Sequence, residues 1–151
     1  MFTSYSITTF TPQGQRMNPE KVIFGFFIVL ALTLNVGFFI GDMDNSTHHS
    51  AMELFLAIIV NLIATFLKWG DRSQLGAVLL ATSLVADLQL MAAAVFWGII
   101  FYASQTTGLY GADRVLDGKE LATIISLSGG ALVANIISVT LLVIETVMLR
   151  R

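Results

Sequence analysis

Three polar side chains that could bind a proton or a small cation stand inside long apolar segments of the sequence. They are Asp87, Asn35 and Asn135. Each lies fourteen or fifteen residues from the charged residue at the cytoplasm-proximal end of its own segment, which is about 22 Å along an α-helix. The spacing therefore predicts that the three side chains lie at nearly one depth in three different helices.

Asp87 carries the strongest chemical signal of the three. An ionisable side chain in hydrocarbon costs about 3 kcal/mol or more, and an asparagine could supply packing bonds at a lower desolvation cost. No Lys or Arg stands at the depth of Asp87. A carboxyl group beside Asn35 and Asn135 could hold a dehydrated Na⁺ or K⁺, or exchange a proton. The asparagines have an alternative role, since they also serve as hydrogen-bonding residues between packed helices.

Further polar residues follow helical spacing in the same segments. The last apolar segment has steps of 7, 3 and 7 residues between polar positions, which places them along one side of a helix. This stripe describes either a lined pathway or a tightly packed bundle interior. Its members are Ser128, Asn135, Ser138 and Glu145. Asn61 in the second segment and Ser83 in the third belong to similar polar or small-residue stripes and share the same two interpretations. Because Glu145 lies near the charged boundary, we expect it to form an ion pair with Lys68 or Arg72, or to stand as a charge in an inner vestibule.

A second polar group precedes the second apolar segment and contains Asp42, Asp44, His48 and His49. Imidazoles and carboxylates can bind a divalent metal, but adjacent histidines point in different directions and the spacing matches no defined metal motif. The residues Ser50 and Glu53 fit the capping box that opens a helix. We therefore predict no metal site, and these four residues remain its weak candidates.

Composition excludes several classes of function. The chain has no cysteine, which removes disulfides and thiol catalysis, and its net charge of −2 does not favour nucleic acid as a partner. No phosphate-binding loop, serine elbow or zinc-protease signature is present in the sequence. An intramembrane catalyst built on Asp87 alone would lack a partner acid or nucleophile, so we expect no enzyme.

The elements that must position these side chains are four long apolar helices. Of the 151 residues, 56% are hydrophobic and 12% are charged, which is far from the balance of a soluble domain. A hydrocarbon core about 30 Å thick needs roughly 20 apolar helical residues, and four stretches meet that length. The expected helices run about 19–41, 51–69, 74–103 and 119–149. We predict an all-α integral membrane four-helix bundle over 18–151, preceded by a flexible arm at 1–17.

The distribution of positive charge predicts the orientation of the bundle. One side collects six basic residues and the other keeps Arg114 and Lys119. The six are Arg16, Lys21, Lys68, Arg72, Arg150 and Arg151. Since Lys and Arg close to helix ends favour the cytoplasmic side, both termini are expected in the cytoplasm.

The pair Gly129 and Gly130 interrupts the last apolar segment and has two interpretations. A break there would leave unwound backbone, which membranes tolerate only where protein or water satisfies it. Alternatively, the glycines allow a neighbouring helix to approach closely. The spacing of residues alone does not decide between the two.

The run ATSLVADLQL at 81–90 and the ending VIETVMLRR at 143–151 resemble a family of small uncharacterised bacterial inner-membrane proteins. The resemblance covers most of the chain after Met17. It implies a four-helix protein of the inner membrane, and it implies no activity or site.

Together these patterns predict an oligomer that conducts or couples a small cation or proton, with Asp87 at its centre and Asn35 and Asn135 beside it. The alternative is a non-transporting subunit or scaffold of a larger membrane complex. Besides the lipid bilayer, the expected partner is a second copy of the chain or such a complex. We expect no cofactor other than a monovalent cation or a proton.

Overall fold

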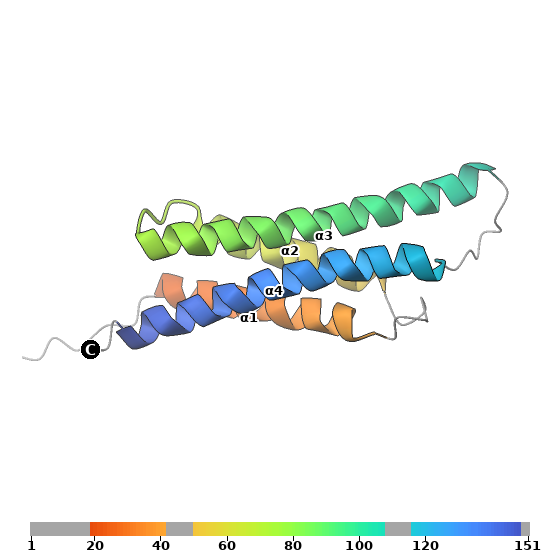
Figure 1. Cartoon of the computed structure of the whole chain (residues 1–151). Coiled ribbons are helices and arrows are strands. Elements are labelled where there is room, and N and C mark those ends of the chain that lie inside the picture. The colour runs from red at the N-terminus through yellow and green to blue at the C-terminus, as the bar shows by residue number, and fades with distance from the viewer. Residues whose placement is uncertain (1–18, 42–49, 108–115, 149–151) are drawn as a thin grey trace, which may run out of the picture.

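The computed structural model describes residues 19–41, 50–107 and 116–148. Within these ranges the chain is all-helical, as predicted (Figure 1). The four helices are α1 (Pro19–Ile40), α2 (Ala51–Lys68), α3 (Gln74–Thr107) and α4 (Gly118–Met148). The predicted end of the third helix lay near residue 103, whereas α3 continues to Thr107. Each helix is long and apolar enough to cross a membrane.

Local side-chain hydrogen bonds cap the first turns of α2 and α4. The Ser50 hydroxyl accepts a hydrogen bond from the backbone N–H of Met52 at 3.2 Å and caps α2, as the Ser-x-x-Glu pattern indicates. At the start of α4, the Asp117 carboxylate accepts from the N–H of Lys119 at 2.7 Å and of Glu120 at 3.0 Å. The Glu120 carboxylate accepts in return from the N–H of Asp117 at 3.1 Å, which completes a capping box. These caps satisfy amide groups that a helix end leaves without internal partners.

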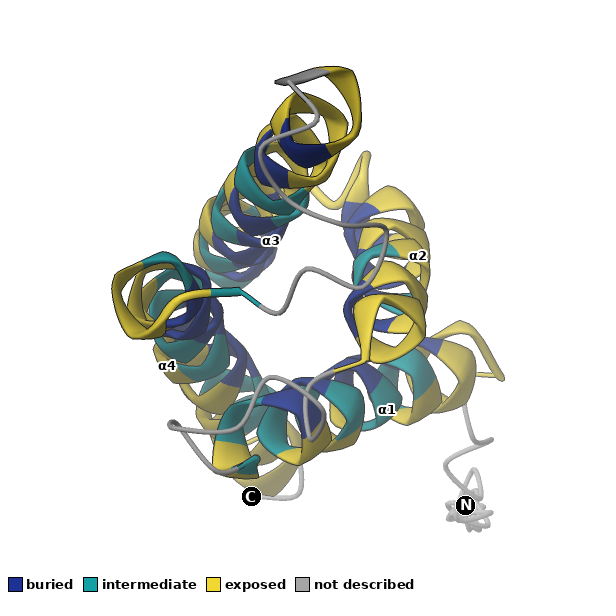
Figure 2. Cartoon of the chain, turned by 90° about the vertical axis from the view of Figure 1, so that its right-hand side faces the viewer, coloured by how far each residue is buried: buried dark blue, intermediate teal, exposed yellow. Residues whose placement is uncertain are grey.

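The helices form a closed ring in which each one packs against its neighbours in sequence, and α4 also packs against α1 (Figure 2). Buried residues face the middle of the ring and exposed residues face outward. The outward faces are apolar: Phe26, Leu88 and Ile99 are among many large hydrophobic side chains that stay exposed. An apolar outer surface is expected of helices that are surrounded by lipid.

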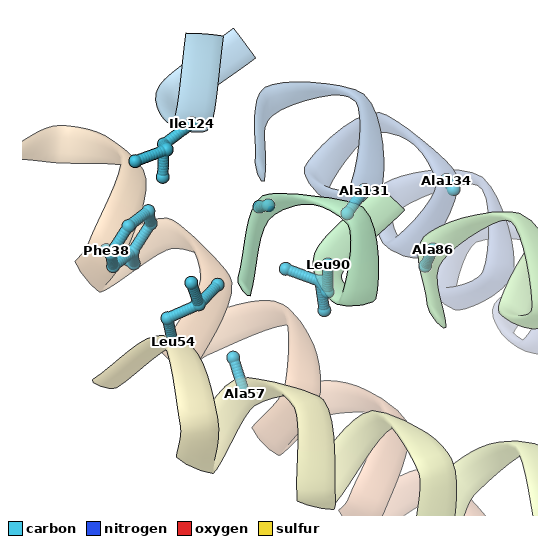
Figure 3. Packing of buried hydrophobic residues seen from close by; sticks show 9 residues of the cluster. Phe38, Leu54, Ala57, Ala86, Leu90, Ile124, Ala131 and Ala134 are labelled. Atoms are coloured by element: carbon cyan, nitrogen blue, oxygen red, sulfur yellow. The ribbon is translucent and has the colours of Figure 1, made fainter. Parts of the chain in front are cut away.

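Two apolar clusters fill the middle of the ring. The larger one includes Phe38, Leu54, Leu90 and Ile124 from all four helices (Figure 3). The smaller one consists of Phe24, Ile28, Ala64 and Leu79. Polar residues stand between the members of the two clusters along the chain. Asn35 lies between Ile28 and Phe38, Asn61 between Ala57 and Ala64, and Ser83 between Leu79 and Ala86. Buried polar residues therefore lie between the two apolar clusters.

The helix α4 continues without a break through its glycine pair. A Cβ atom added at Gly129 would lie 2.8 Å from Phe39 Cε2, and one at Gly130 would lie 2.5 Å from Gln89 Nε2. Both glycines thus allow close approach of side chains from α1 and α3. The packing interpretation of the pair holds, and the interpretation as a break in the helix does not.

Candidate functional site

Asp87 lies on the inner face of α3 and is 2% exposed. Its Oδ1 accepts a hydrogen bond from Asn61 Nδ2 at 2.9 Å, and its Oδ2 accepts from Thr65 Oγ1 at 2.6 Å. Asn61 and Thr65 stand one turn apart on α2 and therefore share the side that faces α3. Both donors are neutral, so within the described residues these hydrogen bonds supply no positive charge to the carboxyl group.

A second polar contact joins α1 to α4. Ser128 Oγ donates to Asn35 Oδ1 at 2.6 Å, and both residues are fully buried. The Nδ2 atom of Asn35 and both polar atoms of Asn135 are buried without a hydrogen-bond partner among the described residues. The hydrogen bonds of Asp87 therefore go to α2, and neither Asn35 nor Asn135 forms one with it.

The heights of these residues follow from the contact between α3 and α4, which run in opposite directions. The hydroxyls of Thr82 and Ser138 lie 2.6 Å apart, so these two residues share a level. Asp87 is five residues beyond Thr82, and Asn135 is three residues before Ser138. The two side chains thus differ by about two residues, or about 3 Å, along the bundle axis. Asn35 pairs with Ser128, which is about 10 Å further than Asn135 from the end of the bundle where α4 ends. The predicted common depth therefore holds for Asp87 and Asn135 and is wrong for Asn35.

We define the polar layer as the buried residues Asn35, Asn61, Ser83, Asp87 and Asn135. Besides the atoms named above, Asn61 Oδ1 and Ser83 Oγ also lack a hydrogen-bond partner within the described part of the chain. Ser83 stands one turn before Asp87 on α3 and so shares its helix face. An unpaired buried polar group costs about 1 to 3 kcal/mol, and its presence in a native interior requires an explanation.

The ion pairs gather at the end of the bundle where α1 begins and α4 ends, on the left of Figure 1. Lys21 Nζ lies 2.7 Å from Glu145 Oε1. Glu145 therefore does form an ion pair, but the predicted partners Lys68 and Arg72 were wrong. Because α4 packs beside α1 in the ring, the ionic partner of Glu145 comes from α1.

Lys68 is only 6% exposed and turns towards the α2–α3 connection. Its Nζ lies 3.2 Å from Asp71 Oδ2 and 4.5 Å from the centre of the Phe24 ring. Hydrogen bonds from the backbone N–H and then the side chain of Ser73 hold the pKa of the Asp71 carboxyl below its ordinary value, with a smaller contribution from Lys68. A hollow of about 350 Å³ opens here between α1 and α2, lined in part by Lys21, Lys68 and Asp71.

The weak metal candidates Asp42, Asp44, His48 and His49 lie outside the described residues. Among residues 19–41, 50–107 and 116–148, no group of three or more His, Cys, Asp or Glu side chains could hold a metal ion. The polar layer contains a single carboxylate, together with amide and hydroxyl groups.

Sequence reasoning did not assign Thr65 to the site, although its hydroxyl makes the shorter of the two hydrogen bonds to Asp87. The available signal was the i, i+4 spacing of Asn61 and Thr65. Thr82, the partner of Ser138, was also missed.

Four apolar helices of membrane-spanning length around a buried polar interior indicate a multi-pass membrane protein. The chain belongs to a family of unknown function (DUF6394), whose family model matches residues 48–146. This agrees with the predicted resemblance to an uncharacterised family. The match covers α2, α3 and nearly all of α4, and therefore includes Asp87, Asn61 and Asn135. Neither the curated proteins nor the solved structures contain a match to the chain.

Proposed function

We propose that this protein is an oligomer of the bacterial inner membrane that conducts or couples a small cation or a proton, with Asp87 as its central site. The single observation that carries the proposal is the setting of Asp87. A carboxyl group is almost fully buried halfway along a membrane-length helix, and its hydrogen bonds come from a neutral amide and a neutral hydroxyl.

This setting favours reversible loading of the carboxyl group. A buried carboxylate is stable only when a nearby positive charge or strong hydrogen bonds compensate for lost hydration. Two neutral donors compensate in part, so binding a cation or a proton completes the neutralisation. An asparagine at position 87 would fit the same space and would need no such compensation.

The charges support an orientation with both termini in the cytoplasm. Lys21, Lys68 and Arg72 belong to the end of the bundle where α1 begins, α2 ends and α3 begins. Lys119 belongs to the opposite end, at the start of α4. The bias of basic residues towards the first end supports its proposed cytoplasmic location.

A second function is favoured by one observation on the same residue. Both oxygens of Asp87 bond to α2, so the carboxyl group also fastens α2 to α3. A subunit or scaffold of a larger membrane complex could use Asp87 in this way alone. In that case replacing Asp87 would alter stability or assembly and no ion would move.

The test is ion flux in proteoliposomes, measured for wild type and Asp87→Asn purified in the same oligomeric state. Proton flux is followed with an internal pH dye, and Na⁺ and K⁺ flux with ion-selective dyes. We expect wild-type flux above that of empty vesicles and loss of that flux in Asp87→Asn. Absence of flux from the intact wild-type oligomer under all three gradients would contradict the proposal and favour the scaffold.

A further inference from the structure

The polar layer leaves both kinds of hydrogen-bonding atom without partners. Asn61 Oδ1 is an unpaired acceptor and Asn35 Nδ2 is an unpaired donor. Asn135 contributes one of each, since neither its Oδ1 nor its Nδ2 has a partner within the described part of the chain. Exchanging the amide oxygen and nitrogen of Asn135 would leave the same one donor and one acceptor.

This mixture restricts the ligand that could occupy the interior. A bare Na⁺ or K⁺ would satisfy the oxygens, but it would repel the amide N–H groups of Asn135 beside them. An anion would satisfy the N–H groups, but it would lie near the level of the Asp87 carboxylate. Water donates and accepts, so it can complete the hydrogen bonds of every member of the polar layer.

The positions also suit a cluster of water molecules rather than one. Asn61 shares a hydrogen bond with Asp87, Ser83 is one turn away on α3, and Asn135 lies at almost the same level on α4. Asn35 on α1 pairs with Ser128 and lies about 10 Å from Asn135 along the bundle axis. The unpaired atoms of Asn61, Ser83 and Asn135 thus come from three different helices, α2, α3 and α4.

We propose that the polar layer holds internal water molecules that connect Asp87 to Asn135, and that the ion handled at Asp87 is therefore the proton. The part of this proposal that concerns the ion rests on the proposed function, whereas the hydration of the layer does not. In each cycle a hydronium ion gives its proton to an Asp87 carboxylate oxygen and remains as water. The same carboxyl group then returns the proton to another water molecule and becomes a carboxylate again.

Hydration is tested without any flux measurement, in the full chain reconstituted in lipid. Asparagine side chains and the backbone nitrogens of isoleucine are labelled with ¹⁵N, and solid-state NMR records how fast magnetisation passes from water to each of the five asparagine side-chain amides and to the isoleucine backbone amides. The variant Asn135→Leu, whose side chain has the same branching and is apolar, identifies the Asn135 signal by its disappearance. We expect the Asn135 amide to receive water magnetisation much faster than the backbone amides of the buried Ile28 region. If magnetisation passed from water to the Asn135 amide as slowly as to the Ile28 region, the proposal that the polar layer is hydrated would be wrong.

The identity of the ion is tested by flux under opposed gradients, for wild type, Asn135→Leu and Asn135→Ser. Displacing water with leucine should reduce proton flux, and serine, which is small and polar, should preserve most of it. The variant Gly98→Ala is a control, because a Cβ there would contact nothing within 4 Å. Flux of Na⁺ or K⁺ in place of protons would overturn the assignment of the ion. A hydrated Asn135 in a protein without any flux would refute the proposed function and leave the water cluster in place.

Discussion

Two substitutions of Asp87 should separate its structural role from its ionic role. Asp87→Asn keeps the shape of the side chain: its amide oxygen can accept from Asn61 Nδ2, and its amide nitrogen can donate to the Thr65 hydroxyl. Thr65 can then turn its own hydrogen to the backbone carbonyl one turn earlier. We expect the free energy of unfolding to change by less than about 1 kcal/mol.

Asp87→Leu removes both acceptors. Thr65 can again turn its hydrogen to the backbone carbonyl one turn earlier, whereas the Asn61 amide is left buried without a partner. At about 1 to 3 kcal/mol for that unpaired group, the expected loss is about 1 to 3 kcal/mol. Interhelical hydrogen bonds measured in membrane proteins average about 0.6 kcal/mol, so the two bonds alone set a lower limit of about 1 kcal/mol. If water enters the space beside Leu, the loss will lie near that limit.

The assay is reversible unfolding of the purified protein in mixed micelles with increasing denaturing detergent, followed by loss of helical circular dichroism. Thr65→Val is the comparison variant, because it removes one of the two hydrogen-bond donors to Asp87 and keeps the β-branched shape of the side chain. The order of stability should be wild type close to Asp87→Asn, then Thr65→Val, then Asp87→Leu. Equal stability of Asp87→Leu and wild type would refute the assignment of the two hydrogen bonds.

Three further predictions concern the ends of the bundle and the packing of α1. Glu145→Gln should lower stability by less than about 1 kcal/mol, since Lys21 is 44% exposed, and the double exchange Lys21→Glu with Glu145→Lys should restore it at low salt. Because the pKa of Asp71 in the folded protein lies below its ordinary 3.8, its ionised form stabilises the fold fully above pH 3.8. That contribution is lost as the pH falls through the lower folded-state pKa, so Asp71→Asn should flatten the acid end of a stability profile measured from about pH 5 downward. Gly25→Ala should add up to about 1 kcal/mol in the same unfolding assay, because its nearest neighbour would be 3.5 Å away. Gly129→Ala should lose that gain, because the new Cβ would lie 2.8 Å from an aromatic carbon.

The helices could be predicted from sequence because hydropathy reports burial in any apolar medium, either lipid or protein. The prediction ended α3 too early for the same reason. Beyond Tyr102 the residues become polar, although Ser104 and Thr106 donate hydrogen bonds to carbonyls of the preceding turn and remain helical. Hydropathy marks where a helix leaves the apolar medium, which is a different position from the end of the helix.

The partners of the charged and polar groups could not be predicted, because depth alone does not say which helices are neighbours or how each is rotated. Glu145 has Lys68 and Arg72 near its depth, yet α4 packs against α1, and Lys21 becomes its partner. For Asp87, counting residues from charged ends selected Asn35 and Asn135. Asn61 is only seven residues from the end of α2 at Lys68, so the same count would place it nearer the membrane surface.

The closed ring of helices has a consequence for the order in which the protein assembles. Three of its four helix pairs are neighbours in sequence and can form as successive helices enter the bilayer. The fourth pair, α1 with α4, is secured by contacts that span 93 residues between Asn35 and Ser128 and 124 residues between Lys21 and Glu145. The bonds of Asp87 to α2 span only 22 and 26 residues, so they can be complete while α4 is still being synthesised. Insertion of α4 is then the step that closes the bundle, and a chain interrupted before it would expose the amide of Asn35 to lipid.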